Sequence, residues 1–188
     1  MTNRYVMNEH REIRVAISGR SGCGNTTVSR LLAEALDISF INFTFRSLSA
    51  EMGIPLEDII ERAKHDTSFD RIVDERQVEL ARSSSCVLGS RLAVWMLKEA
   101  DLKVYLTASE EVRAKRILNR EGGDFEEIKR FTSLRDAEDN RRYKELYAID
   151  NNEYSFCDLI IDTEQYLPEE IVEIILNRLE EKGLVTKE

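Results

Sequence analysis

The sequence has 188 residues, 42% of them hydrophobic, which suits one folded domain with its own core and argues against a disordered chain. Its net charge of −9, from 27 basic and 36 acidic side chains, disfavours a nucleic-acid polymer as a partner except at a local basic site. Three scattered cysteines, two histidines and no apolar run near the ~18 residues of a membrane span favour a cytoplasmic protein with reduced thiols and no membrane contact.

The first part of the chain predicts a strand, a glycine-rich loop and a helix in direct succession. The β-branched run Ile13–Ser18 is typical of a buried parallel strand, and apolar residues recur at helical spacing from Thr26 to Leu36. A second short strand is expected at Ile38–Asn42. Residues 44–84 have an entirely helical pattern, in which Pro55 suits the first turn of a helix because its missing N–H would have no partner there.

The second part predicts three more strands, at Ser85–Ser90, Leu102–Ala108 and Cys157–Thr163. Ser109 should cap a helix that runs to the two glycines at 122–123, and a final amphipathic helix should run from Pro168 to Gly183. The charged stretch 124–151 is helical in pattern with few core residues, as expected of a mobile flap. Five short apolar strands separated by helices predict an α/β fold with a doubly wound, five-stranded parallel sheet.

The stretch "ISGRSGCGNTTVSRLL" is close to the phosphate-binding pattern G-x-x-x-x-G-K-[ST], with Gly19 and Gly24 in register. Glycines let successive backbone N–H groups point at phosphate oxygens, the helix start adds its dipole, and the Thr26 hydroxyl is placed to bind Mg²⁺. A simple glycine-rich turn is the competing interpretation, which the flanking strand and helix disfavour. We expect nine residues to bind the phosphates of ATP: Gly19, Arg20, Ser21, Gly22, Cys23, Gly24, Asn25, Thr26 and Thr27.

Asn25 occupies the position of the lysine in this pattern and carries no charge. Two interpretations remain open: another cation replaces the lysine, or phosphoryl transfer is weakened. Arg20, directly after the first glycine, is the candidate replacement, and the hypothesis requires that Arg20→Ala impair turnover.

Several separated stretches, in order and at fitting distances, carry a resemblance to one family. They are "FINFTFRSLSAEMGIPLEDI", "DRIVDERQVELAR", "VLGSRLAVWMLKEADLKVYLTASEEVRAKRILNREG", "RRYKELYAID" and "YSFCDLIIDT". From Ile13 to about Leu179 the chain resembles the archaeal-type cytidylate kinases, small P-loop kinases related to adenylate kinase. The resemblance implies one three-layer kinase domain, monomeric, that uses ATP and Mg²⁺ and accepts CMP or dCMP. Its core would span about 13–43, 85–123 and 157–183, with a nucleoside-monophosphate-binding insert at 44–84 and a lid at 124–151.

Arginines follow the predicted strands at the edge where ligands bind in such sheets, and their planar forks suit the shielding of phosphates. The resemblance implies that Arg46 and Arg91 hold the acceptor's monophosphate and that Asp70 and Arg71 face the cytosine. It also implies that three arginines close over the transferred phosphate: Arg120, Arg135 and Arg142. Solvated helix faces explain Arg71, Arg116 and Arg141 equally well, and Asp74 and Asp136 are interpreted as ordinary helix charges.

A second departure from the family follows the third strand, where the chain has "LGSRLAVWM" and its relatives tend to have "LEGRLAGWM". Gly89 thus replaces an acid that can help to hold the water shell of Mg²⁺. Losing one group that stabilises charge in a transition state usually costs ~2.7–4 kcal/mol of activation free energy. Here a lost cation and a lost anion partly offset each other, so we expect Asn25→Lys alone to raise turnover less than about a hundredfold.

The sequence therefore predicts transfer of the γ-phosphoryl group of ATP to CMP or dCMP. Two alternatives stay open: a nucleotide-binding regulatory protein that has lost catalysis, as Asn25 and Gly89 would allow, and a P-loop kinase with another small acceptor.

Overall fold

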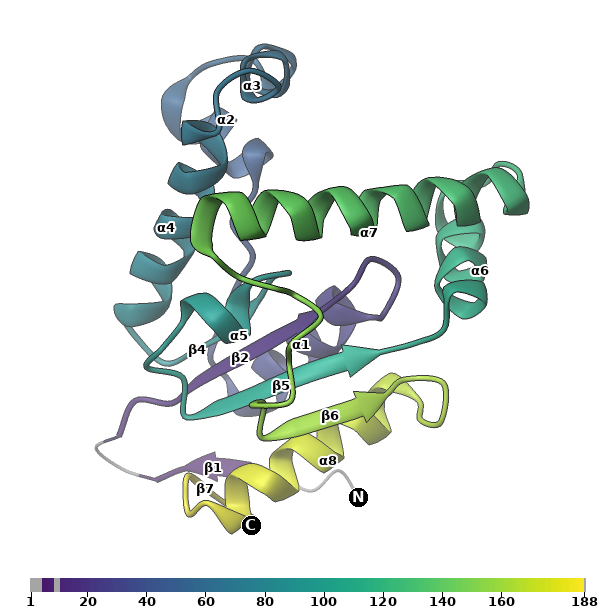
Figure 1. Cartoon of the computed structure of the whole chain (residues 1–188). Coiled ribbons are helices and arrows are strands. Elements are labelled where there is room, and N and C mark those ends of the chain that lie inside the picture. The colour runs from purple at the N-terminus through teal and green to yellow at the C-terminus, as the bar shows by residue number, and fades with distance from the viewer. Residues whose placement is uncertain (1–4, 9–10, 188) are drawn as a thin grey trace.

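The computed structural model describes residues 5–8 and 11–187, and its centre is a parallel sheet with strand order β3-β4-β2-β5-β6 (Figure 1). The five strands fall where the sequence predicted them: β2 (Arg14–Gly19), β3 (Ser39–Ile41), β4 (Cys86–Gly89), β5 (Leu102–Thr107) and β6 (Leu159–Asp162). The predicted α/β fold with a five-stranded parallel sheet is confirmed.

Helices cover both faces of the sheet, which gives the three layers. Successive side chains of β2 point to opposite faces of the sheet. Val15 and Ile17 belong to the core beneath α1 (Asn25–Leu36) and α8 (Pro168–Glu181), and Ala16 belongs to the core on the other face. The opposite core contains residues of α4 (Ser68–Arg82) and α5 (Ala93–Met96).

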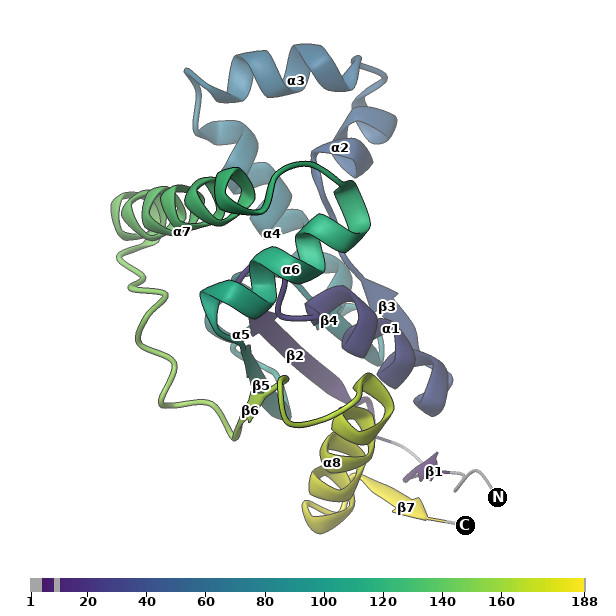
Figure 2. The same ribbon diagram turned by 90° about the vertical axis from the view of Figure 1, so that its right-hand side faces the viewer.

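The stretch 44–84 is helical as predicted and folds into α2 (Phe45–Met52), α3 (Leu56–Ala63) and α4, which rise above the sheet (Figure 2). Ser109 caps α6 (Glu110–Glu121) as predicted, since its hydroxyl accepts a hydrogen bond from the amide of Val112. The charged stretch that follows forms one continuous helix, α7 (Phe125–Tyr147), which crosses over the carboxyl edge of the sheet (Figure 1).

A second, two-stranded sheet was not predicted. It pairs β1 (Tyr5–Met7) antiparallel with β7 (Val185–Lys187), and the Tyr5 hydroxyl hydrogen bonds with Glu173 and Asn177 on α8. Strands of three residues at opposite ends of the chain carry too little periodicity to be found from sequence. None of the described helices combines the length and apolar character that a bilayer crossing requires.

Candidate active site

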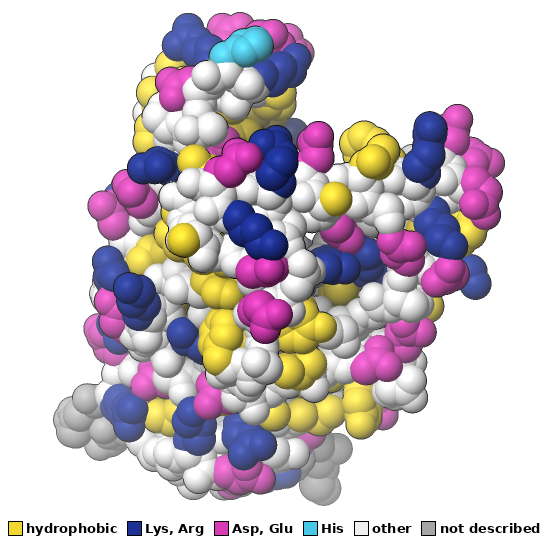
Figure 3. Space-filling model, in the orientation of Figure 1, with side chains coloured by type: hydrophobic (Ala, Val, Ile, Leu, Met, Phe, Trp, Pro, Cys, Tyr) yellow, Lys and Arg dark blue, Asp and Glu magenta, His cyan; other side chains and the backbone are white. Residues whose placement is uncertain are grey.

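A cavity of about 1510 Å³ lies at the carboxyl edge of the sheet, beneath α7. Ordinary small-molecule pockets measure roughly 300–1,000 Å³, so this cavity has room for two nucleotide-sized ligands. Its walls come from the glycine-rich loop, α4, the turn after β4, and α7. Dark-blue and magenta side chains adjoin one another along the recess beneath α7 (Figure 3), so cations and anions meet there instead of forming a patch of one sign.

The glycine-rich loop from Gly19 to Thr27 forms one wall of the cavity. Gly22 and Gly24 have φ angles of +85° and +91°, which other residues rarely adopt, so these glycines permit the tight curl of the loop. The loop leads into the N-terminus of α1, where no side chain caps the first turn. The first amides of α1 are therefore available to a ligand, which is the geometry that phosphate binding requires.

Two arginines of α6 hold this loop by its carbonyl groups. Arg113 donates to the carbonyl oxygen of Ser21 (3.2 Å), and Arg116 donates to that of Gly22 (3.3 Å) and to Thr163. A Cβ atom on Gly22 would lie 2.9 Å from both the Cβ and the backbone carbonyl oxygen of Arg113, so only glycine lets the loop approach the backbone of α6 this closely. Because the carbonyls are held on the α6 side, the conformation of the loop depends on α6 as well as on its own glycines.

Asp136 is not the ordinary helix charge that the sequence predicted. It forms a 2.8 Å ion pair with Arg113, whose side chain is only 2% exposed. The sequence prediction was wrong because the pattern of α7 shows many charges but does not show which of them meets a buried cation. Asp136 therefore joins α7 to the arginine that supports the phosphate loop.

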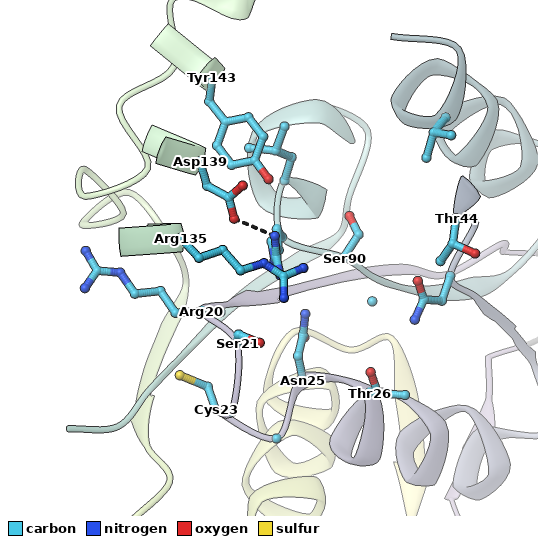
Figure 4. Close-up of a pocket in the computed structure, with 18 of the residues that line it drawn as sticks. Arg20, Ser21, Cys23, Asn25, Thr26, Thr44, Ser90, Arg135, Asp139 and Tyr143 are labelled. Atoms are coloured by element: carbon cyan, nitrogen blue, oxygen red, sulfur yellow. Dashed lines mark hydrogen bonds and ion pairs between the residues drawn. The ribbon is translucent and has the colours of Figure 1, made fainter. Parts of the chain in front are cut away.

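The lysine position of the pattern is filled by Asn25, whose side chain points into the cavity toward Arg135 on α7 (Figure 4). Arg20, the predicted replacement for the lysine, points the other way (Figure 4). Its guanidinium hydrogen bonds with Asn152 (2.5 Å) and lies 3.9 Å from Asp136. Arg135 thus supplies a cation from α7 on the side toward which Asn25 points, next to the guanidinium of Arg91.

Thr26, the predicted Mg²⁺ ligand, is exposed at the start of α1 and lines the cavity. The described residues contain no cluster of three His, Cys, Asp or Glu side chains that would hold a metal ion by itself. A hydroxyl at a helix N-terminus beside a phosphate loop fits Mg²⁺ that is carried in by a nucleotide, since phosphate oxygens and waters together supply most of the ligands in such sites.

On the other side of the cavity, arginines and carboxylates form a connected series between α4 and α7. Arg91 pairs with Asp139 (2.5 Å), Asp139 also pairs with Arg142 (2.9 Å), and Arg142 reaches Asp70 (3.5 Å). Burial raises the pKa of Asp70, while Arg142 opposes that rise. The structure therefore brings together three of the predicted residues: Asp139, a carboxylate that the sequence analysis did not identify, joins Arg91 to Arg142, and Arg142 contacts Asp70.

Asp74 also departs from the prediction of an ordinary helix charge. It lines the cavity, accepts a 2.7 Å hydrogen bond from the hydroxyl of Tyr147 at the end of α7, and accepts another from Gln77. Burial raises the pKa of Asp74 to about 6, although the Tyr147 hydrogen bond acts in the opposite direction. Packing of α7 over α4 buries this carboxyl group, and the sequence of α4 alone does not reveal that contact.

Gly89, where the sequence analysis expected an acid in relatives, is closely surrounded. A Cβ atom there would lie 2.5 Å from the hydroxyl of Ser29, 2.8 Å from its Cβ and 2.9 Å from the ring of Phe40. An acidic side chain at position 89 therefore has no room while Ser29 and Phe40 keep these positions.

Most predicted site residues line the cavity, but Arg46 and Arg71 are exposed and are missing from the described residues that line it. The sequence analysis gave no role to Arg113 and Asp139, and it interpreted Asp136 as an ordinary helix charge. Asp136, Asp139 and Arg142 recur every three positions on α7, and this spacing is the signal that could have placed them on one face. The predicted residues on the cavity wall are Gly19, Arg20, Ser21, Gly22, Cys23, Gly24, Asn25, Thr26, Thr27, Asp70, Arg91, Arg120, Arg135 and Arg142.

The geometry of the cavity does not by itself identify the family of the protein, but its sequence does. The model of the cytidylate kinase-like family matches residues 14–165, which include the glycine-rich loop, α4, the turn after β4 and α7. The chain belongs to this family. The protein named cytidylate kinase 2 from Borreliella burgdorferi is 42% identical over 176 residues, which cover 92% of this chain and 98% of that protein. The cytidylate kinase of Archaeoglobus fulgidus is 38% identical and matches 92% of this chain and 97% of its own.

Solved structures with the same fold are more distant in sequence. A shikimate kinase from Acinetobacter baumannii in complex with shikimate superposes with a TM-score of 0.63 at 20% identity, over 92% of this chain and 96% of that one. A deoxyadenosine kinase from M. mycoides with bound dATP gives a TM-score of 0.54 at 17% identity, over 89% of this chain and 100% of that one. These similarities establish the P-loop kinase fold and do not identify the substrate.

Proposed function

We propose that this protein is an ATP-dependent cytidylate kinase that transfers the γ-phosphoryl group of ATP to CMP or dCMP. The observation that carries the proposal is a single cavity, in a member of the cytidylate kinase-like family, that has helix-start amides on one wall and converging arginines on the other. Curated relatives that are 38–42% identical over nearly their whole length bear the name cytidylate kinase.

In the proposed reaction, an oxygen of the acceptor's phosphate forms a bond with the γ-phosphorus, and the bond from that phosphorus to the bridging oxygen breaks to release ADP. The attacking oxygen is already ionised at neutral pH, so no general base is needed, and positioning and charge shielding supply the catalysis. Mg²⁺, bound to the phosphates and to Thr26, would contribute further positive charge.

The roles of individual side chains are proposed from their places on the walls. The phosphate loop holds ATP, and Arg91 with Arg142 holds the acceptor's phosphate in place of Asp139 and Asp70. Arg120, which lies on α6, and Arg135, which lies on α7, shield the negative charge of the transferred group. Arg46 and Arg71 lie outside the cavity wall, so they would touch a ligand only after their exposed side chains, or the helices that carry them, change position.

A coupled assay of ADP formation tests the function directly. With ATP and Mg²⁺, we expect turnover with CMP and dCMP to exceed turnover with UMP and AMP. CMP binding without turnover would instead support a regulatory nucleotide-binding protein, the alternative that Asn25 allows. Preference for a different acceptor would overturn the assignment to cytidylate.

A further inference from the structure

The arginines around the cavity differ in whether they already have a partner. Arg91 and Arg142 pair with carboxylates, Arg120 pairs with Glu121, and Arg141 pairs with Glu145. Arg116 donates to Thr163, and Arg20 donates to Asn152. Arg135, by contrast, makes no hydrogen bond or ion pair with any described residue, although it lies in the same wall.

Arg135 is also crowded by a like charge. It remains accessible to solvent in the cavity, yet desolvation, followed by the nearby Arg91 guanidinium, lowers its pKa. Two guanidinium groups that approach each other with only one carboxylate between them leave a local excess of positive charge. An anion of the ligand is the partner that this arrangement lacks.

The wall opposite Arg135 carries the uncharged side chain of Asn25. Asn25 extends from the start of α1 toward Arg135 (Figure 4), and its amide oxygen is buried and has no hydrogen-bond partner among the described residues. In the usual phosphate-loop pattern a lysine stands at this position and brings the charge from the loop itself. Here the loop brings an uncharged amide and the charge faces it from α7.

We propose that Arg135 supplies from α7 the positive charge that the phosphate loop lacks at Asn25, so that the terminal phosphates of ATP are held between these two side chains. The inference rests on the proposed function in taking ATP as the ligand. It replaces Arg20 as the substitute cation, because the guanidinium of Arg20, although Arg20 lines the cavity, hydrogen bonds with Asn152 and points away from Asn25. Binding of ATP then depends on the position of α7, and not on the loop alone.

The test removes the positive charge at Arg135 on α7 and places one at Asn25 on the phosphate loop. ATP binding is measured by calorimetry in the presence of Mg²⁺ for the wild type, Arg135→Gln, Asn25→Lys and the double variant Asn25→Lys/Arg135→Gln. We expect Arg135→Gln to weaken ATP binding at least tenfold, and the double variant to recover most of that loss. Asn25→Lys alone should gain less than tenfold, because its ammonium would face an existing cation. CMP binding should change less than threefold in Arg135→Gln.

Two further measurements separate this role from general damage. Arg130→Gln removes an exposed arginine of α7 that is missing from the described cavity wall, and it should bind ATP as the wild type does. Without ligand, Arg135→Gln should melt at the same or a higher temperature than the wild type, because a repulsion with Arg91 is removed.

Wild-type ATP affinity in Arg135→Gln would overturn the proposal, and so would a double variant that binds ATP no better than Arg135→Gln. Failure of the proposed function would look different. If the variants show the expected changes in ATP binding but the protein does not phosphorylate CMP, the ATP site stands and only the assignment as a cytidylate kinase is wrong.

Discussion

Asp136 and Asp139 lie three positions apart on α7 and both meet arginines, but the two contacts differ in kind. Asp136 pairs with Arg113, whose side chain is 2% exposed and also supports the phosphate loop. Asp139 pairs with Arg91 and Arg142, whose side chains are 30% and 37% exposed and border the cavity. One contact belongs to the framework beneath the glycine-rich loop, and the other lies in the wall where we propose that the acceptor binds.

The difference shows how one helix can both support a site and serve as part of it. A ligand phosphate cannot reach the Asp136 contact, because Arg113 is buried beneath the loop. At Asp139 a phosphate can take over the same guanidinium hydrogen bonds that the carboxylate now accepts, since both anions suit the planar fork of arginine. Carboxylates of the protein therefore neutralise Arg91 and Arg142 on the proposed acceptor side, whereas Arg135, on the proposed ATP side, has no hydrogen bond or ion pair with the described residues.

The largest expected effect follows from removing each carboxylate in turn. Asp136→Ala leaves a buried cation without its partner, and we expect the free energy of unfolding to fall by about 3–5 kcal/mol. Asp139→Ala leaves Arg91 and Arg142 able to reach water, so we expect a loss below about 2 kcal/mol. Urea denaturation of both variants provides the comparison.

The exposed pair of Arg141 and Glu145 supplies the control, because Arg141→Ala should change the free energy of unfolding by less than about 1 kcal/mol. Equal losses in Asp136→Ala and Asp139→Ala would abolish the distinction between a framework contact and an exchangeable one.

A smaller effect, which depends on pH, is expected on the acceptor side at Asp74. Its pKa is raised to about 6 by burial, with Asp70 adding to the rise and Tyr147 and Arg142 opposing it. Stability from this group is fully present below the ordinary pKa of 3.8 and is lost as pH rises through about 6, because the folded protein disfavours the charged form. The whole change amounts to at most about 3 kcal/mol, from 1.36 kcal/mol per pKa unit.

Asp74→Asn keeps an acceptor for Tyr147 and removes the titration. Relative to the wild type, this variant should gain stability between pH 4 and pH 7, as measured by urea denaturation at each pH. Glu75→Gln, at an exposed position next in the chain, should show no such trend. A constant difference between Asp74→Asn and the wild type across this range would mean that Asp74 is not buried by α7 as described.

The success of the sequence analysis depended on whether the deciding interactions were local. Short apolar runs, each bounded by helical segments, identified all five strands of the main sheet, and the phosphate loop was found because its glycines are contiguous with β2 and α1. The direction of the Arg20 side chain could not be predicted, because it depends on Asn152, far along the chain. Asp74 and Asp136 were misjudged because α7, with its many charges, does not reveal which face is buried before it packs.

The smallest effect is expected at Gly89, on the donor side. Because a Cβ atom there would approach Ser29 to 2.5 Å, Gly89→Ala should lower the free energy of unfolding by about 1–3 kcal/mol, the usual cost of overpacking. Ser29→Ala removes the nearest oxygen but leaves its Cβ, so adding it to Gly89→Ala should recover only part of the loss. Full stability in Gly89→Ala would mean that space does not exclude an acid from this position. The absence of the acid would then have to be explained by charge, as a response to the loss of the lysine at Asn25.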